Sequence, residues 1–340
     1  MKLKRLAACV LTIAMTCAVA LTGCGSSVDA NATGATLNEK EISLGFMNFM
    51  AKYQQATYDS IYTLYFGTDY WSQEITEGMT MEDSVKSEIA SSIERLYLLE
   101  EHMADYGVSI TEEEMAAIEA AAARFLSDND QKAIEQMGAT TEYVAEMLRL
   151  YTIEQKMRAA IYAEEPAEVT DKEAAQRTFS YIRVSATTTT DDEGNSVDLT
   201  AEAKAELEVR LTELSKAAQE DFEEAAEADG YSVYSYSYGS DESSMAEEVI
   251  AAADAMKEGD VSNLIVTENA YYIIRLDSEF DKEATEQRRT QLIEEKKAAH
   301  YTEVCDGYME AADFQINEDA WAQVTFDKLF AIVTGEETGE

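Results

Sequence analysis

The chain has 340 residues, of which 46% are hydrophobic and 28% are charged, and it contains a single proline. Acidic residues (68) outnumber basic residues (26), which gives a formal net charge of −42. A surface of this charge repels nucleic acid phosphates and anionic lipid headgroups, so the composition argues against either as a binding partner. The length is enough for two domains, and the near absence of proline favours helices.

Residues 1–23 are predicted to be an export signal. Cationic residues at the start precede an apolar run, residues 6–20, that is too short for a comfortable transmembrane helix. The run ends in LTGC, residues 21–24, which resembles the bacterial lipobox, so Cys24 is the expected lipid attachment site. The alternative is an ordinary secretory signal with a chance cysteine. The lipobox implies a protein at the outer face of the bacterial cytoplasmic membrane, held there by a lipid anchor only.

Residues 24–36 are rich in Gly, Ser, Ala and Asn and are predicted to be a flexible tether. Of the four cysteines, two lie in the signal and Cys24 would be lipidated, so only Cys305 remains. We therefore expect no internal disulfide. Cys305 is predicted to be a small buried residue on a helix rather than a catalytic thiol.

Residues 37–165 are predicted to be an all-α region. Apolar residues recur there at a spacing of three to four, which indicates helices with one buried face. The first such face contains Ile42, Phe46, Phe49, Tyr53, Ile61 and Leu64. A capping box, Thr111-x-x-Glu114, indicates the start of a later helix.

Strand patterns begin after Pro166. Residues 178–186 alternate like a strand, and a long acidic helix is predicted from residue 201 to about 229. A tyrosine at every second position, Tyr234, Tyr236 and Tyr238, places these three side chains on one face of a sheet. A helix near residues 245–256 and two final strands complete a small α+β domain over residues 172–280.

Helical patterns resume at residue 281. We expect residues 281–340 to return to the first helices and to form one domain with them. The apolar anchors of this return are predicted to be Trp321, Phe326, Leu329 and Phe330.

Two segments of the α+β region carry a family resemblance. They are residues 245–262, with Met245, Val249 and the run MKEGDVS, and residues 270–276, AYYIIRL. They resemble the parvulin-type peptidyl-prolyl isomerases that are inserted in the PrsA and SurA class of extracytoplasmic foldases. The runs GVSITEEEM from Gly107 and VTDKEA from Val169 resemble this class too, and the lipobox favours PrsA over SurA.

The resemblance implies an α+β fold in two parts. One part is a helical chaperone domain, similar to the SurA N-terminal domain or to trigger factor. The other is a small parvulin-like domain with a four-stranded sheet, inserted into the helical chain.

The resemblance also implies which residues occupy the catalytic positions of the family. Tyr181 and Tyr272 stand where the family has histidines, and Ser232 stands where it has Cys or Asp. The only histidines of the chain, His102 and His300, lie outside the domain. We therefore expect a degenerate site with weak or absent isomerase activity. Two readings of the tyrosines remain: they are β-forming core residues, or they form a hydrogen-bonded pair in place of the histidines.

By the same resemblance, Met245 and Val249 would line the pocket that receives the proline ring. Asp254 stands where an aromatic residue is usual, and an unpaired carboxylate there would oppose burial of the ring. No cofactor and no metal site are expected, and the acidic stretch at residues 191–195 is read as a polar turn rather than as a calcium loop.

Three functions follow from these patterns. The first is a foldase or chaperone that holds unfolded exported polypeptides, with Met and Tyr side chains available for an adaptable surface. The second is an active isomerase with a tyrosine-based site. The third is a lipid-anchored solute-binding protein, which would need repeated βαβ units. The oligomeric state is left open, with a homodimer among the options.

Overall fold

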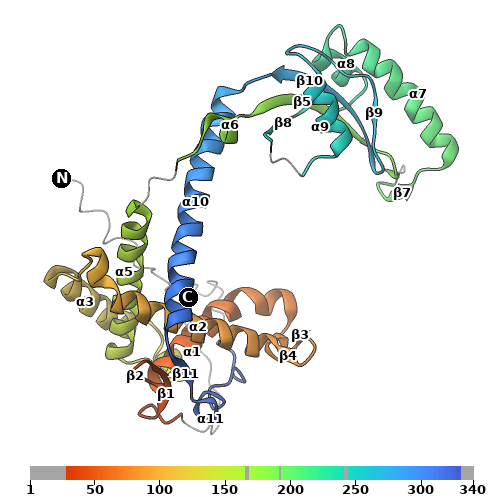
Figure 1. Ribbon diagram of the computed structural model, residues 1–340. Coiled ribbons are helices and arrows are strands. Elements are labelled where there is room, and N and C mark those ends of the chain that lie inside the picture. Colours follow the sequence, from red (N-terminus) through yellow and green to blue (C-terminus); the bar gives the residue numbers. More distant parts are fainter. Residues whose placement is uncertain (1–27, 165–167, 191–192, 241–243, 331–340) are drawn as a thin grey trace, which may run out of the picture. The chain divides into compact units, whose positions relative to one another are not determined.

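The computed structural model describes residues 28–164, 168–190, 193–240 and 244–330 (Figure 1). The export signal and Cys24 lie outside these residues. The chain divides into two compact units, here called the helical unit (Met1–Pro166 with Ala299–Glu340) and the sheet unit (Ala167–Ala298). The predicted mixture of helices with a small sheet domain is confirmed. In the part of the chain that is described, no helix has the length and apolar character to cross a membrane.

Long helices make up most of the helical unit. Capping boxes open two of them: Thr80 and Asp83 at the start of α2, and the predicted pair Thr111 and Glu114 at the start of α3. The helices are α1 (Leu44–Phe66), α2 (Met81–Glu101), α3 (Glu112–Asp128), α4 (Gln131–Met137), α5 (Thr141–Glu164), the short α11 (Glu318–Trp321) and the 3-10 turns η2 (Tyr70–Ser72) and η3 (Met103–Tyr106).

The helical unit also contains strands, which the sequence analysis did not predict. A three-stranded sheet has the order β11-β1-β2, with β1 (Thr33–Leu37), β2 (Lys40–Ser43) and β11 (Phe314–Ile316). A small hairpin pairs β3 (Glu74–Thr76) with β4 (Met79–Thr80). The expectation of an all-α region is therefore wrong. The predicted tether, residues 24–36, is wrong in its last part, because it overlaps β1, where Ala35 is only 1% exposed. The pairing of β1 with β11, far away in sequence, is a tertiary contact that local patterns do not reveal.

The C-terminal segment, residues 317–330, packs into the core of the helical unit. Trp321, Phe326 and Phe330 are buried in one cluster with side chains of α1, α2 and α5. Side chains of α1 and α2 bind its backbone: Gln55 Nε2 donates to the Lys328 carbonyl at 2.9 Å, and Lys86 Nζ to the Val324 carbonyl at 2.7 Å.

A buried carboxylate completes these contacts. Asp59, on α1, accepts hydrogen bonds from the Tyr70 hydroxyl at 2.5 Å, from Trp71 Nε1 at 2.8 Å and from the Phe330 amide at 2.7 Å. Burial raises the pKa of Asp59, and the three hydrogen bonds oppose that rise. The carboxylate joins α1, the turn η2 and the C-terminal segment at one point.

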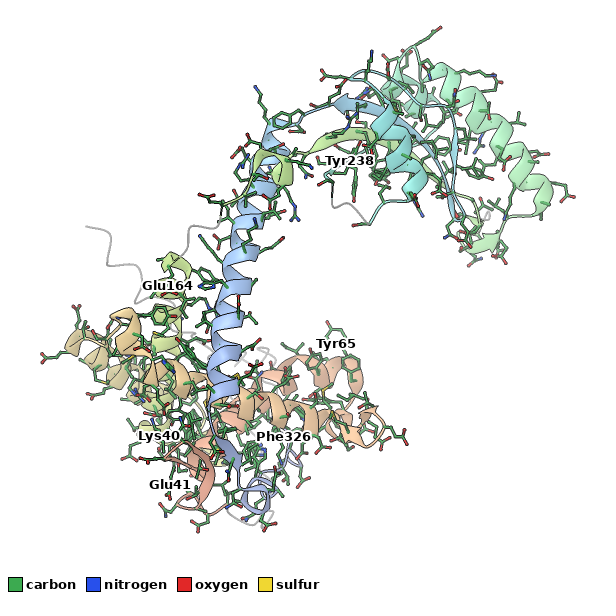
Figure 2. The ribbon with its side chains drawn as sticks, viewed as in Figure 1. Lys40, Glu41, Tyr65, Glu164, Tyr238 and Phe326 are labelled. Carbon is green, nitrogen blue, oxygen red and sulfur yellow. The ribbon has the colours of Figure 1, made fainter. Side chains whose placement is uncertain are left out.

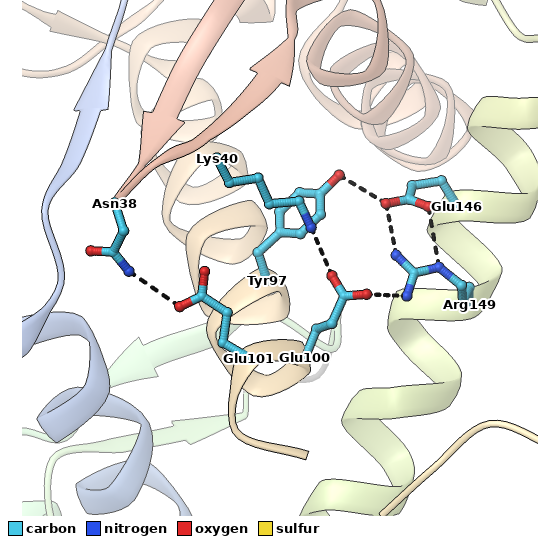
Figure 3. Close-up of polar contacts among 7 residues, drawn as sticks. All are labelled: Asn38, Lys40, Tyr97, Glu100, Glu101, Glu146 and Arg149. Atoms are coloured by element: carbon cyan, nitrogen blue, oxygen red, sulfur yellow. Dashed lines mark hydrogen bonds and ion pairs between the residues drawn. The ribbon is translucent and has the colours of Figure 1, made fainter. Parts of the chain in front are cut away.

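A polar network at the C-terminal end of α2 ties it to β2 and α5 (Figure 3). Lys40 Nζ pairs with Glu100 at 2.8 Å, and Arg149 bridges Glu100 and Glu146. The Tyr97 hydroxyl donates to Glu146 at 3.0 Å. Although burial opposes ionisation of Glu100, the hydrogen bonds from Arg149 and Lys40 lower its pKa. The network therefore holds the β1–β2 hairpin on the helices while the carboxylates are charged.

The sheet unit is built on a four-stranded antiparallel sheet of order β8-β5-β10-β9. Its strands are β5 (Arg177–Ser185), β8 (Tyr234–Tyr238), β9 (Ile265–Val266) and β10 (Ala270–Ser278), and a separate hairpin pairs β6 (Thr188–Thr190) with β7 (Ser196–Asp198). The helices are α6 (Asp171–Ala174), α7 (Ala201–Ala217), α8 (Phe222–Ala228), α9 (Glu247–Ala255) and α10 (Lys282–Ala311), which ends in the helical unit. The long helix predicted up to residue 229 is thus two helices, and Asp221 caps the second of them.

Helices cover both faces of this sheet. Helices α7 and α8 pack on one face, against Ile182, Tyr271 and Ile273. Helix α9 packs on the other face, against Phe179, Tyr272 and Ile274. Because successive residues of a strand point to opposite faces, Tyr271 and Tyr272 belong to different cores. Tyr271 donates a hydrogen bond to Glu208 of α7 at 2.8 Å, so the sheet is filled on both sides.

Candidate functional site

The face of the sheet under α9 is lined with aromatic rings from three strands and is here called the tyrosine face. Its rings lie 5.5 to 6.1 Å apart between centroids, with tilted or edge-on geometry. The tyrosine face consists of Phe179 and Tyr181 on β5, Tyr234, Tyr236 and Tyr238 on β8, and Tyr272 on β10. The three tyrosines of β8 share one face, as their alternation predicted.

Tyr181 and Tyr272, the two tyrosines at the predicted histidine positions, are neighbours on this face. Their ring centroids are 6.1 Å apart. Tyr272 is only 8% exposed, and its hydroxyl accepts a hydrogen bond from Arg183 Nε at 3.2 Å. The observed partner of the Tyr272 hydroxyl is thus an arginine, not the second tyrosine that a tyrosine pair would require.

The residues predicted to line a proline pocket lie within the packed layer. Val249 of α9 is 0% exposed, and Met245, half-buried, packs against the same cluster as the tyrosine face. Ser232 lies apart from them, exposed, two residues before β8 begins. The structure therefore brings Tyr181, Tyr272 and Val249 to one face and leaves Ser232 at its margin.

Asp254 differs from its predicted state. The family resemblance implied an unpaired carboxylate beside a proline ring, whereas Asp254 is exposed and accepts a hydrogen bond from the Tyr238 hydroxyl at 2.9 Å. Burial and this hydrogen bond raise the pKa of Tyr238 to about 12. The aspartate therefore fastens α9 to β8.

Two arginines on the same face were missed. Arg183 binds Tyr272, and Arg177 Nη2 donates to the carbonyls of Ala253 and Met256 at 3.1 and 2.9 Å, at the end of α9. Both were within reach of sequence reasoning, since residues 177, 179, 181 and 183 alternate along β5 and so share a face. Among the described residues, no group of His, Cys, Asp or Glu side chains could hold a metal ion.

A second candidate site lies in the helical unit, at the end of α1 and in the β3–β4 hairpin. Leu64 and Tyr65 are 70% and 77% exposed, and Figure 2 shows Tyr65 projecting outward from the end of its helix. The Gln73 side chain donates to the Phe66 carbonyl at 3.5 Å and so links the hairpin to α1. This surface is here called the apolar tip, and its members are Ile61, Leu64, Tyr65, Phe66, Ile75 and Met79.

The apolar tip corrects one expectation from the sequence. Ile61 and Leu64 continue the apolar spacing of α1 and were assigned to its buried face. Phe46 and Phe49, at the start of α1, are indeed buried, but the last turns of the helix extend beyond the core and carry exposed side chains. Contiguous exposed apolar side chains mark interaction surfaces in soluble proteins.

Comparison with known proteins finds a family model in the middle of the chain. Residues 160–287 match the PPIC-type PPIASE domain. No curated protein matches the chain in sequence.

The structure is similar to several solved ones at low TM-scores. Foldase protein PrsA from Lactococcus lactis shares 16% identity at a TM-score of 0.35, over 86% of this chain and 97% of that chain. Foldase protein PrsA from Streptococcus pneumoniae shares 18% identity at a TM-score of 0.30, over 76% of this chain and 99% of that chain. A structure described as that of SurA-like chaperones from Campylobacter jejuni shares 10% identity at a TM-score of 0.29, over 84% of this chain and 99% of that chain.

The family match covers the whole four-stranded sheet, the helices on both of its faces and the tyrosine face. Residues 160–287 are therefore a parvulin-type (PPIC-type) domain, as the resemblance predicted.

Proposed function

We propose that this protein is an extracytoplasmic foldase of the PrsA and SurA class whose main activity is to hold unfolded exported polypeptides. The observation that carries the proposal is the apolar tip, which leaves large apolar side chains in solvent within a chain that also has a parvulin-type domain. Unfolded polypeptides expose apolar side chains that aggregate, and a surface of this kind shields them.

We further propose that prolyl isomerisation is weak or absent. Rotation about a peptide bond has a barrier of about 18–20 kcal/mol, and a catalyst must receive the proline ring in an apolar pocket and stabilise the twisted amide. At the positions that the family resemblance assigns to such a pocket, Val249 is fully buried and the rings of the tyrosine face pack against one another. A proline ring would have to displace part of this layer.

The runner-up is an isomerase that uses Tyr181 and Tyr272. The short distance between their rings favours it, whereas the bond between Tyr272 and Arg183 does not. The solute-binding alternative finds no support, because the sheet is antiparallel and lacks the repeated βαβ units that this class needs.

Two assays on the purified protein test the proposal. Delayed aggregation of a chemically unfolded polypeptide, together with near-background isomerisation of a proline tetrapeptide, is the expected result. Tyr272→Phe should change neither activity. Robust isomerisation that is lost in Tyr272→Phe would establish the runner-up. Aggregation as fast with the protein as without it would refute the holding function.

We also propose that Cys24 is lipidated and anchors the protein to the membrane. The support is the LTGC sequence at the end of the apolar run. Cys24→Ala should then yield a protein that is released or left unprocessed and no longer partitions into detergent. A Cys24→Ala protein that still partitions as a mature lipoprotein would contradict the anchor.

A further inference from the structure

The apolar tip lies in a part of the chain with a one-sided charge. Between Lys52 and Lys86 the sequence contains no Lys, Arg or His. The same interval carries the acidic residues Asp59, Asp69, Glu74, Glu77, Glu82 and Asp83. In sequence, the charges nearest to the exposed apolar side chains are therefore all negative.

The two flanking lysines are both engaged by the C-terminal segment. Lys52 Nζ donates to the carbonyl of Thr325, and Lys86 Nζ donates to the carbonyls of Trp321 and Val324, at 3.1 and 2.7 Å. Both lysines are thus bound to the C-terminal segment at the base of the tip.

The carboxylates around the tip are open to a partner. Asp69, Glu74 and Glu77 are exposed, and within the described residues none of them forms an ion pair with a cation. Glu74 and Glu77 stand on the same short hairpin as the exposed side chains of Ile75 and Met79. Apolar and anionic side chains therefore follow one another along this hairpin, and all of them are exposed within the part of the chain that the structure describes.

The tip rests on a firm base. Rings continue from the core towards the tip, with Tyr58–Tyr62 centroids at 5.3 Å and Tyr62–Phe66 centroids at 5.6 Å. Below them, Asp59 binds Tyr70 and Trp71. Because its base is held in this way, the tip presents its groups without first having to fold, which lowers the entropic cost of binding.

We propose that the apolar tip binds segments of unfolded polypeptide in which apolar residues are interspersed with Lys or Arg. This deepens the proposed holding function and rests on it, by naming the chemical class of segment that is held. Apolar side chains of the segment would pack on Leu64, Tyr65 and Phe66, and its cations would approach Glu74 and Glu77. Complementary charge raises association rates and selects among partners of equal hydrophobicity.

Charge also decides against two other occupants. A second copy of the chain carries the same formal charge of −42, and tip-to-tip contact would bring like carboxylates together. An anionic lipid surface would be repelled by the same carboxylates. A cationic apolar segment is the occupant that relieves rather than increases this repulsion.

The test uses three labelled peptides with identical apolar residues and with Lys, Ser or Glu at the intervening positions. Fluorescence anisotropy with the purified protein should show binding of the Lys peptide at least tenfold tighter than binding of the Glu peptide, with the Ser peptide between them. Added salt should weaken binding of the Lys peptide most, because salt screens interactions between exposed charges.

Two variants and matched controls locate the site. The double variant Leu64→Ser with Tyr65→Ser should bind the Lys peptide at least tenfold more weakly. The double variant Glu74→Gln with Glu77→Gln should bind it about threefold to tenfold more weakly, and this binding should depend less on salt. Val209→Ser, at an exposed apolar position of α7, and Glu112→Gln with Glu113→Gln, on exposed α3 carboxylates, should leave binding unchanged.

The outcomes separate this inference from the proposed function. If the protein delays aggregation but Leu64→Ser with Tyr65→Ser binds the Lys peptide like the wild type, the tip is not the site, although the holding function stands. Equal binding of the Lys and Glu peptides overturns the charge preference. Tip-dependent self-association in sedimentation, or tip-dependent binding to vesicles of anionic lipid, without binding of the Lys peptide, also overturns the proposal. If the wild-type protein does not suppress aggregation, the holding function itself is refuted.

Discussion

Two regions of this protein are rich in aromatic and large apolar side chains, and these side chains are packed in one region and exposed in the other. On the tyrosine face, rings from β5, β8 and β10 pack on one another and α9 lies over them. At the apolar tip, Tyr65 and Phe66 stand on the last turn of α1 with their side chains in solvent. Residue type is similar in the two places, and the difference lies in whether a second layer covers the residues.

The difference assigns the two regions to different tasks. The tyrosine face lies in the parvulin-type domain, where a pocket is expected, but Phe179, Tyr238 and Tyr272 are buried there as core, and only Tyr234 at its edge is 52% exposed. Among the described residues, the apolar tip is exposed, so its area can bind another molecule. Burial of apolar area contributes roughly 25 cal/mol per Å², so a face that is already packed has spent this contribution on folding, whereas an exposed one retains it for binding.

The base of the tip gives the largest predicted effect. Asp59→Ala removes the acceptor of three buried donors, and we expect a loss of about 4 kcal/mol in unfolding free energy. Urea unfolding followed by tryptophan fluorescence measures it, because Trp71 and Trp321 both belong to the helical unit. The exposed Asp69→Ala is the control and should change stability by less than about 0.5 kcal/mol. Similar results for both variants would show that the base is not held by Asp59.

Opening the tyrosine face should cost nearly as much. Tyr238→Ala removes a buried ring from between Phe179 and α9, and we expect the sheet unit to lose about 3 kcal/mol. Hydrogen exchange of β5 and β10 amides, read by mass spectrometry, measures this loss in the sheet unit. Tyr65→Ala, at the tip, is the matched control and should leave exchange unchanged throughout. Unchanged exchange in Tyr238→Ala would mean that the tyrosine face is not core, and the comparison would fail.

A smaller effect depends on pH. The pKa of Tyr238, about 12 in the folded protein, lies above its ordinary value of about 10. The stability contributed by the neutral hydroxyl is therefore fully present below pH 10 and is lost as the pH rises from 10 towards 12. Tyr238→Phe should cost about 1 kcal/mol at pH 8 and progressively less above pH 10. The same hydrogen-exchange measurement at pH 8 and, after correction for intrinsic exchange rates, at pH 11 checks this; an equal cost at both values would contradict it.

The smallest predicted effect is at the tip itself. Leu64→Ser should change the unfolding free energy of the helical unit by less than about 0.5 kcal/mol, because the side chain gains little burial on folding. Tryptophan fluorescence in urea is again the measurement, with the buried Leu96→Ser as the contrasting variant, expected to lose several times more. A large loss in Leu64→Ser would show that the tip contributes to the fold and is not free for a partner.

Much of the architecture was predictable because it depends on local spacing. The capping box of Thr111 and Glu114 places the start of α3 from residues three apart, and the alternation of Tyr234, Tyr236 and Tyr238 places them on one face of β8. The motifs around Met245 and in residues 270–276 led to the parvulin-type domain through resemblance, and the family match includes them. In each case the residues that form the pattern are close in sequence, so the pattern can be recognised without knowledge of the fold.

What the sequence could not decide depends on residues that meet only in the folded chain. Strand β1 is the middle strand of its sheet because Phe314–Ile316 pairs with it, and Asp254 has a hydrogen-bond partner because Tyr238 of β8 reaches it. The periodicity of α1 continues unchanged from Phe49 to Leu64, yet one side chain is buried and the other exposed. An amphipathic helix specifies which face is apolar, whereas the elements packed around it determine how much of that face is covered.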